Sequence, residues 1–207
     1  MRALILFVFW TFCLTTNVHS QEIGFAVKGG LNLSTLSFSE THDRSSSGRT
    51  AFHVGVVAEI PITEKFSVQP ELLYSAEGGK YVIGGSTSVP NNLEEKIDYL
   101  NLPVMAKYYL VDGFAVEAGP QLGYLVSGKT YEMFLVEGKG KINEKDAHHA
   151  FAFGLGAGIS YEFPVGIFIA TRYHIGLNEV YDNFRFRHYE DWKVKKNNFQ
   201  LSLGYFF

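Results

Sequence analysis

Apolar side chains recur at every second position through most of this sequence, and this alternation limits the folds that the chain can adopt. The first such segment places Phe25, Val27, Gly29, Leu31 and Leu33 on one side of an extended chain. A period of two residues is typical of a β-strand, whose successive side chains point to opposite faces. The same period recurs over residues 52–60, 66–75, 99–109, 114–126, 151–161, 167–177 and 199–207. The pattern predicts eight β-strands, and no apolar run beyond residue 20 is long enough for a transmembrane helix.

The connections between these segments alternate in length. Long polar stretches follow the first, third, fifth and seventh segments, at residues 35–49, 76–96, 128–149 and 178–198. Short turns follow the second, fourth and sixth, at residues 61–65, 111–113 and 164–166. An antiparallel up-and-down barrel accounts for this, because alternate connections then lie at the same end. Outer-membrane barrels have short periplasmic turns and long external loops, so we expect four long external loops.

The residues opposite the apolar face decide between a soluble barrel and a membrane barrel. They include many glycines and six charged residues: Lys28, Glu59, Glu71, Lys107, Glu117 and Arg172. The apolar face of the eight segments carries no charged residue, as expected where a cation at the bilayer midplane costs about 2–4 kcal/mol. We therefore predict an all-β, eight-stranded transmembrane barrel with a balanced charge network in its lumen. Side chains fill the interior of a barrel of this size, which argues against an open porin.

The first twenty residues have the pattern of a secretory signal peptide. A positive end at Arg2 precedes an apolar run over residues 3–14, and Ser20 provides a small residue at the cleavage site. The run is shorter than the ~20 residues of a membrane anchor. We expect residues 1–20 to be removed and residues 21–207 to form the barrel domain in the outer membrane of a Gram-negative cell. The lone cysteine, Cys13, lies in the removed segment, so no disulfide is expected.

The last predicted strand alternates up to an aromatic residue at the end of the sequence. Tyr205 and Phe207 complete a series that begins at Phe199. This pattern is similar to the C-terminal signal by which outer-membrane proteins are recognised by the barrel-assembly machinery. The resemblance implies that this machinery is a partner during biogenesis.

Several short motifs in the predicted strands resemble those of the PorT family of small outer-membrane barrels. They occur in the family's order, at residues 27–34, 99–103, 107–109, 118–124, 154–158 and 172–177. Members of the family often carry an Asp before the glycine run of the sixth strand, where this chain has AFAF at residues 150–153. We expect this departure to change the polarity of the lumen and not the fold. The resemblance implies the barrel fold; a role in secretion does not follow from it.

One predicted external loop combines aromatic and basic residues. These residues are Phe184, Arg185, Phe186, Arg187, Trp192 and Lys193. We interpret them as a candidate surface for anionic lipid headgroups or another protein; the alternative is a strand hairpin that extends above the membrane.

The sequence contains no convincing catalytic, metal or cofactor site. Residues 41–47 include His, Asp and Ser, but nothing in such a loop fixes their geometry. His148 and His149 are adjacent and would point to opposite faces of a strand. His174 is expected to form hydrogen bonds in the lumen. We therefore expect neither catalysis nor a bound metal or cofactor.

Composition excludes two further classes of protein. With 46% hydrophobic residues the chain is not disordered, and with 21 acidic against 18 basic residues it is not a nucleic-acid binder by bulk charge. We expect a structural, adhesive or assembly-associated outer-membrane protein that contacts outer-membrane lipid and uses its external loops for a protein partner. A narrow small-solute channel and a membrane-embedded lipid-modifying enzyme remain the alternatives.

Overall fold

The computed structural model describes residues 22–38, 46–83, 91–133, 139–143, 149–178 and 194–207. The expected signal peptide, the loop at residues 41–45 and His148 lie outside these ranges. So do the binding candidates Phe184, Arg185, Phe186, Arg187, Trp192 and Lys193. Among the described residues, no helix is long and apolar enough to cross a membrane.

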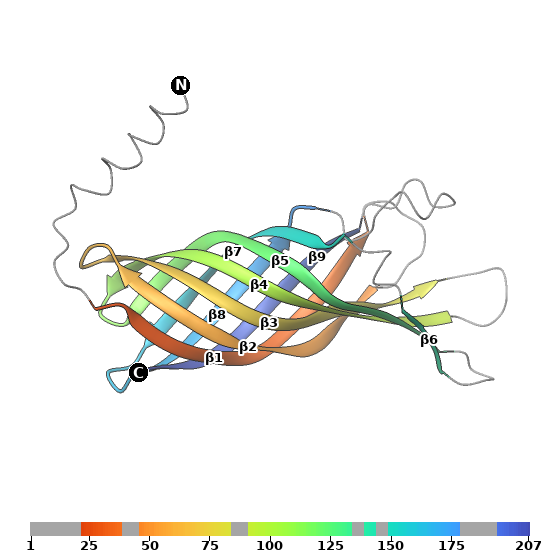
Figure 1. Ribbon diagram of the computed structural model, residues 1–207, viewed down its shortest axis with the longest axis horizontal. Coiled ribbons are helices and arrows are strands. Elements are labelled where there is room, and N and C mark those ends of the chain that lie inside the picture. Colours follow the sequence, from red (N-terminus) through yellow and green to blue (C-terminus); the bar gives the residue numbers. More distant parts are fainter. Residues whose placement is uncertain (1–21, 39–45, 84–90, 134–138, 144–148, 179–193) are drawn as a thin grey trace, which may run out of the picture.

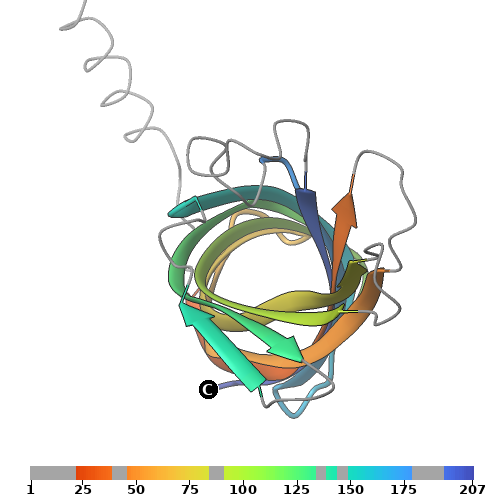
Figure 2. The same ribbon diagram turned by 90° about the vertical axis from the view of Figure 1, so that its right-hand side faces the viewer.

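The described residues form antiparallel β-strands (Figure 1). In chain order the strands are β1 Gly24–Phe38, β2 Ser46–Pro61, β3 Phe66–Ile83, β4 Asn91–Val111, β5 Phe114–Met133, β6 Lys139–Asn143, β7 Phe151–Glu162, β8 Ile167–Gly176 and β9 Val194–Phe206. Eight of them form a ring in the order β4-β3-β2-β1-β9-β8-β7-β5, and a β4–β5 pairing closes it. Viewed from the loop end, the strands surround one axis (Figure 2). The predicted eight-stranded barrel is confirmed.

The first and last strands form one seam of the ring. Their register extends from Ala26 opposite Phe206 to Phe38 opposite Val194. Hydrocarbon offers no hydrogen-bond partners, so a sheet in lipid needs this closure to satisfy the backbone of its outer strands.

The two faces of the wall are those predicted from the alternation. Phe25 is 60% and Leu203 is 59% exposed on the outer face, whereas Lys28 and Arg172 are each 2% exposed inside. The outer face is therefore apolar where it crosses the membrane, and the interior holds the charges.

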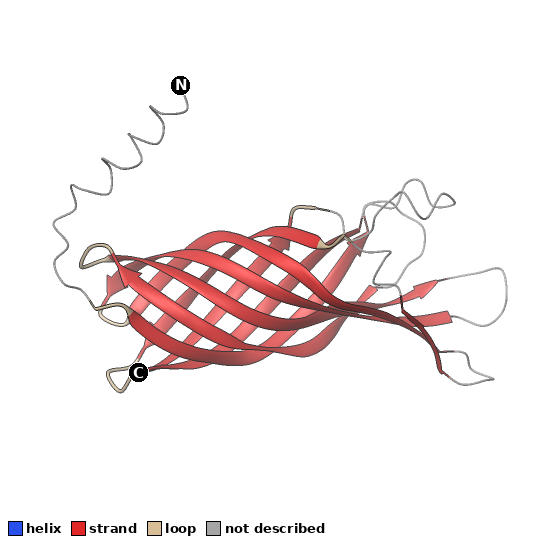
Figure 3. Cartoon of the chain, viewed as in Figure 1, coloured by secondary structure: helices blue, strands red, loops and turns tan. Residues whose placement is uncertain are grey.

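The strands extend further beyond the membrane than predicted. β3, β4 and β5 continue through much of residues 76–96 and into residues 128–149, which we expected to be loops (Figure 3). β6 lies in the second of these stretches and pairs with the end of β5. Beyond the lipid the outward side chains no longer need to be apolar, and charged residues such as Glu77 and Glu95 are buried on the inner face. The backbone ladder therefore continues while the hydropathy alternation disappears. β7 begins only at Phe151 and β8 ends at Gly176. The wall of the barrel is therefore lower at β7 and β8 than at β3, β4 and β5.

Small apolar clusters lie inside the barrel near each end. At the loop end Leu36, Ile97, Tyr99 and Leu125 pack together. At the short-turn end Ala26, Val57, Phe168 and Ala170 pack together, with Phe206 against them. Buried polar side chains, among them Glu71 and Arg172, occupy the rest of the interior.

Gly119 tests the close packing of the strands. A Cβ at this position would lie 2.0 Å from the carbonyl oxygen of Val104, so Gly119→Ala requires the backbone to move. We expect this substitution to lower the free energy of unfolding by about 1–3 kcal/mol, measured by urea titration in lipid vesicles. Gly29→Ala is the control, because its Cβ would meet no atom closer than 3.5 Å. Equal stability of the two variants would contradict this packing.

Candidate functional site

Four buried charges meet in the middle of the barrel, each from a different strand. Lys28 on β1 lies 3.0 Å from Glu71 on β3, measured from Nζ to Oε2. Arg172 on β8 approaches Glu71 at 2.6 Å through Nη2. The same Nη2 donates to Glu117 Oε2 on β5 at 3.2 Å, and Arg172 Nε donates to Glu117 Oε1. These four residues, the central cluster, form a cross-link through the lumen.

The central cluster balances two cations against two anions in a space closed to water. The four side chains are each at most 3% exposed. Burying a charge is costly unless a partner and further hydrogen bonds accompany it. Gln69 supplies one such bond, since its Nε2 donates to Glu71 Oε1 at 2.5 Å.

Glu59 and Lys107 form a second ion pair, toward the short-turn end. Lys107 Nζ lies 2.7 Å from Glu59 Oε2. Ser67 Oγ donates to Glu59 Oε1 at 2.6 Å, and the Tyr109 hydroxyl also donates to it. The six charged residues predicted for the lumen therefore all lie inside, but as a cluster of four and a separate pair, with no ion pair joining the two groups in the described part of the chain.

Glu77 and Lys196 form a third buried pair, which was not predicted from the sequence. Their side chains form an ion pair, and Lys196 Nζ lies 3.7 Å from the centre of the Tyr99 ring. Glu77 Oε1 also accepts from Ser75 at 2.8 Å and from Asn101 at 3.0 Å. Both charges fell in stretches predicted to be loops. The alternation along the strand was the available signal, because Glu77 lies an even number of residues from the inward-facing Glu71 and Ser75 and therefore points the same way.

A hydrogen-bonded layer around His53 also went unpredicted. His53 Nδ1 lies 2.9 Å from Asn32 Oδ1, and His53 Nε2 lies 2.9 Å from Ser202 Oγ. Asn32 Nδ2 donates to Ser75 Oγ at 2.9 Å, and Gln200 Nε2 donates to Asn32 Oδ1 at 3.1 Å. His53 and Ser202 are far apart in the sequence, so only the closed ring brings them together.

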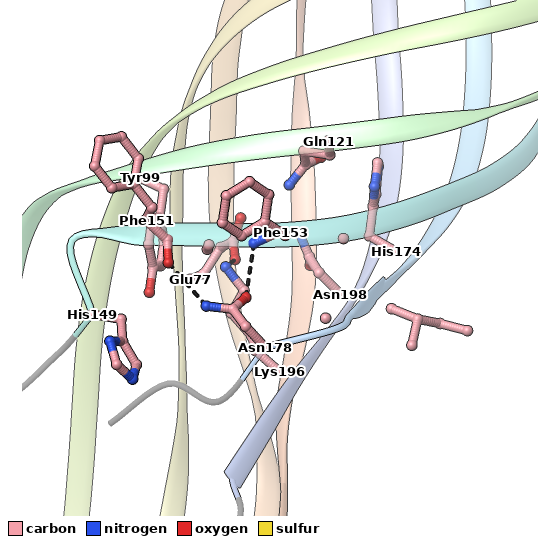
Figure 4. A pocket seen from close by; sticks show the side chains of 14 residues that line it. Glu77, Tyr99, Gln121, His149, Phe151, Phe153, His174, Asn178, Lys196 and Asn198 are labelled. Carbon is pink, nitrogen blue, oxygen red and sulfur yellow. Dashed lines mark hydrogen bonds and ion pairs between the residues drawn. The ribbon is translucent and has the colours of Figure 1, made fainter. Parts of the chain in front are cut away.

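A small cavity lies near the loop end of the interior, beside the low side of the wall (Figure 4). It has a volume of about 30 Å³, which suits one or two water molecules. Its polar lining includes Glu77, Gln121, His174, Lys196 and Asn198. His174 is 5% exposed. Neither of its ring nitrogens has a protein hydrogen-bond partner among the described residues, so the hydrogen bonds that we expected from His174 to lumen side chains are not found in this part of the chain.

Asn178 closes the rim of this cavity. Its Nδ2 donates to the Phe151 carbonyl at 2.9 Å, and the Phe153 amide donates to its Oδ1 at 2.7 Å. The side chain thereby replaces a strand partner at the end of β7. The described residues contain no group of three or more His, Cys, Asp or Glu able to hold a metal ion.

Tyr205 and Phe207 lie at the short-turn end, on the outer face. Their rings meet edge to face with centres 5.8 Å apart. Phe207 is 81% exposed, and its amide donates to the Phe25 carbonyl at 3.0 Å. Its ring is thus largely uncovered although its backbone belongs to the seam.

A closed barrel with an apolar outer face and a charged interior defines an integral outer-membrane β-barrel protein. The model of the family described as "Outer membrane protein beta-barrel domain" matches residues 19–182, and the chain belongs to this family. No curated protein matches the chain.

The chain is also similar in fold to solved structures. It is 13% identical to Ail, the attachment invasion locus protein of Yersinia pestis, with a TM-score of 0.52 over 90% of this chain and 100% of that one. Neisserial surface protein A is 12% identical, with a TM-score of 0.47 over 89% of this chain and 99% of that one. OprG from Pseudomonas aeruginosa is 10% identical, with a TM-score of 0.42 over 89% and 95%. At these identities the likeness describes the fold alone.

Arg172→Met tests the central cluster. The substitution leaves Glu71 and Glu117 buried with fewer partners, so we expect a loss of about 3–5 kcal/mol in the free energy of unfolding, measured by urea titration. Glu94→Gln is the control, since the Glu94 side chain is 31% exposed and its ion pairs are long, at 3.8 Å with Lys96 and 3.7 Å with Arg49. Removing such an exposed pair should cost at most about 1 kcal/mol. If both variants lose the same stability, the central cluster does not form as described.

Proposed function

We propose that this protein is a non-catalytic, non-conducting outer-membrane barrel that acts as a structural, adhesive or assembly-associated component. The supporting observation is the central cluster, in which Arg172 connects Glu71 and Glu117 across the lumen. With apolar clusters near both ends, the interior resembles a protein core more than a solute path. The parts available to a partner are then the loop end and the strands that extend beyond the lipid.

Planar-bilayer recordings test the closed lumen. We expect the folded protein to produce no stable unitary current steps, because ion pairs and apolar side chains occupy its interior. A known open porin recorded in the same bilayers is the control for insertion. Reproducible unitary steps from the purified protein would replace this proposal with the alternative of a narrow small-solute channel.

One observation favours a second candidate, a serine hydrolase. Ser202, His53 and Asn32 have the hydrogen-bond sequence of a catalytic triad, at 2.9 Å for each step. Their burial argues against catalysis, because Ser202 is 4%, His53 1% and Asn32 0% exposed. Asn32 also bonds strands β2 and β3 through Phe52 and Ser75, as a structural residue would.

A fluorophosphonate probe separates the two candidates. We expect the folded wild-type barrel to remain unlabelled, since the probe has no path to Ser202. Labelling that disappears in Ser202→Ala but persists in Ser160→Ala would establish a reactive serine and overturn the non-catalytic proposal. Ser160 is a suitable control because it is also inward-facing and buried, at 7% exposure.

We further propose PorT-type membership within the family and recognition by the barrel-assembly machinery through Tyr205 and Phe207. The first rests on the ordered motifs in the sequence. The second is supported by the exposure of Phe207, which contributes little to packing.

Phe207→Ala tests the assembly signal. We expect refolding of the purified chain in detergent to be unchanged, while the amount of folded protein in the outer membrane falls severalfold. Both are read from the heat-modifiable shift in gel mobility, and Ile23→Ala, an exposed apolar residue just before β1, is the control. Normal assembly of Phe207→Ala in cells would refute the proposed signal.

A further inference from the structure

Three lysines gather on the outer face of β3, β4 and β5, just beyond the membrane-spanning part of the wall. Lys96 on β4 and Lys129 on β5 are direct register partners. Lys80 lies on the neighbouring strand β3, two residues from Gly78, the β3 partner of Lys96. On β4, Glu95 and Ile97 are buried while Lys96 between them is partly exposed, which places Lys96 on the outer face. We refer to Lys80, Lys96 and Lys129 as the outer lysine patch.

The outer lysine patch lies at the level of the lipid headgroups. On β4 the last lipid-facing apolar residue is Leu100, which is 39% exposed. Lys96 is four residues further along the strand. With a rise of about 3.3 Å per residue and a strand tilt of about 45°, it lies about 9 Å beyond Leu100 along the membrane normal. A lysine side chain can reach back into the headgroup layer from there. The patch is at the end opposite the short turns, which is the outer-leaflet side.

The charges in and around the patch leave an excess of cations. Glu94 is shared, since it is the register partner of Lys80 and its Oε1 lies 3.8 Å from Lys96 Nζ and 3.7 Å from Arg49 Nε. Asp98, the other acid on this face of β4, forms a hydrogen bond with the Tyr74 side chain. The two acidic residues, Glu94 and Asp98, are therefore outnumbered by four basic residues. These are Arg49, Lys80, Lys96 and Lys129. Like charges directly opposite each other on neighbouring strands are unfavourable, and an anion beside the Lys96–Lys129 pair would relieve this.

We propose that the outer lysine patch binds the phosphate of an anionic lipid headgroup in the outer leaflet. The group recognised is a phosphate at the edge of the hydrocarbon layer. The ammonium groups of Lys96 and Lys129 donate hydrogen bonds to it from two strands, and Lys80 donates from a third. The site belongs to the outside of the wall, so it is independent of whether the lumen conducts and of any protein partner at the loops.

Native mass spectrometry of the folded protein in detergent tests this proposal. The probes are short-chain phosphatidic acid and short-chain phosphatidylcholine, each titrated against wild type, Lys96→Gln/Lys129→Gln and Lys96→Arg/Lys129→Arg. We expect wild type to prefer phosphatidic acid, and each removed lysine to weaken that binding about fivefold. The arginine variant should bind as wild type does, because it keeps both charges and can still donate to phosphate.

Lys65→Gln and inorganic phosphate complete the test. Lys65 is exposed at the short-turn end, so Lys65→Gln should leave the preference for phosphatidic acid intact. The proposal is overturned if the double glutamine variant keeps that preference, or if Lys65→Gln loses as much of it. It is also overturned if inorganic phosphate competes as well as the lipid does, since the patch would then recognise a free anion.

Discussion

The backbone of this protein must satisfy its own hydrogen bonds inside hydrocarbon, and most of the structure follows from that requirement. A sheet meets it only by closing, and here the β1–β9 and β4–β5 pairings close the ring. Closure divides the side chains between a face in lipid and a face in the lumen. The charged side chains of the membrane-spanning wall thereby lie in the interior, where each needs a partner.

In the lumen, these charged side chains pair with one another from strands that are not adjacent in the ring. Glu71 accepts from both Lys28 and Arg172, Glu59 pairs with Lys107, and Glu77 pairs with Lys196. Each pair skips at least one strand of the ring, and the Glu71–Arg172 pair joins β3 to β8 across the barrel, so the ion pairs also hold separate parts of the wall at a set distance. The barrel is in this respect an inverted globular protein, with its apolar side chains outside and its polar network as the core.

Sequence reasoning predicted the parts of this arrangement that depend on local periodicity. The alternation around Val27 and Leu31 indicated strands, their faces and the inward position of Lys28. It failed where the strands leave the lipid, because Glu77 and Lys196 lie among residues that are polar on both faces. It also did not identify which inward residues meet, since the His53–Ser202 contact depends on the curvature and register of the closed ring.

The seam between β1 and β9 has a consequence for how the chain folds. Residue pairs such as Val27 and Tyr205 are nearly as far apart in sequence as the barrel domain allows. Contacts of such long sequence separation form slowly, because a large loop must be closed before they contribute. Until they form, the edges of β1 and β9 have unpaired backbone groups on which another chain can assemble. The interval between export and closure is therefore when this protein is most exposed to aggregation.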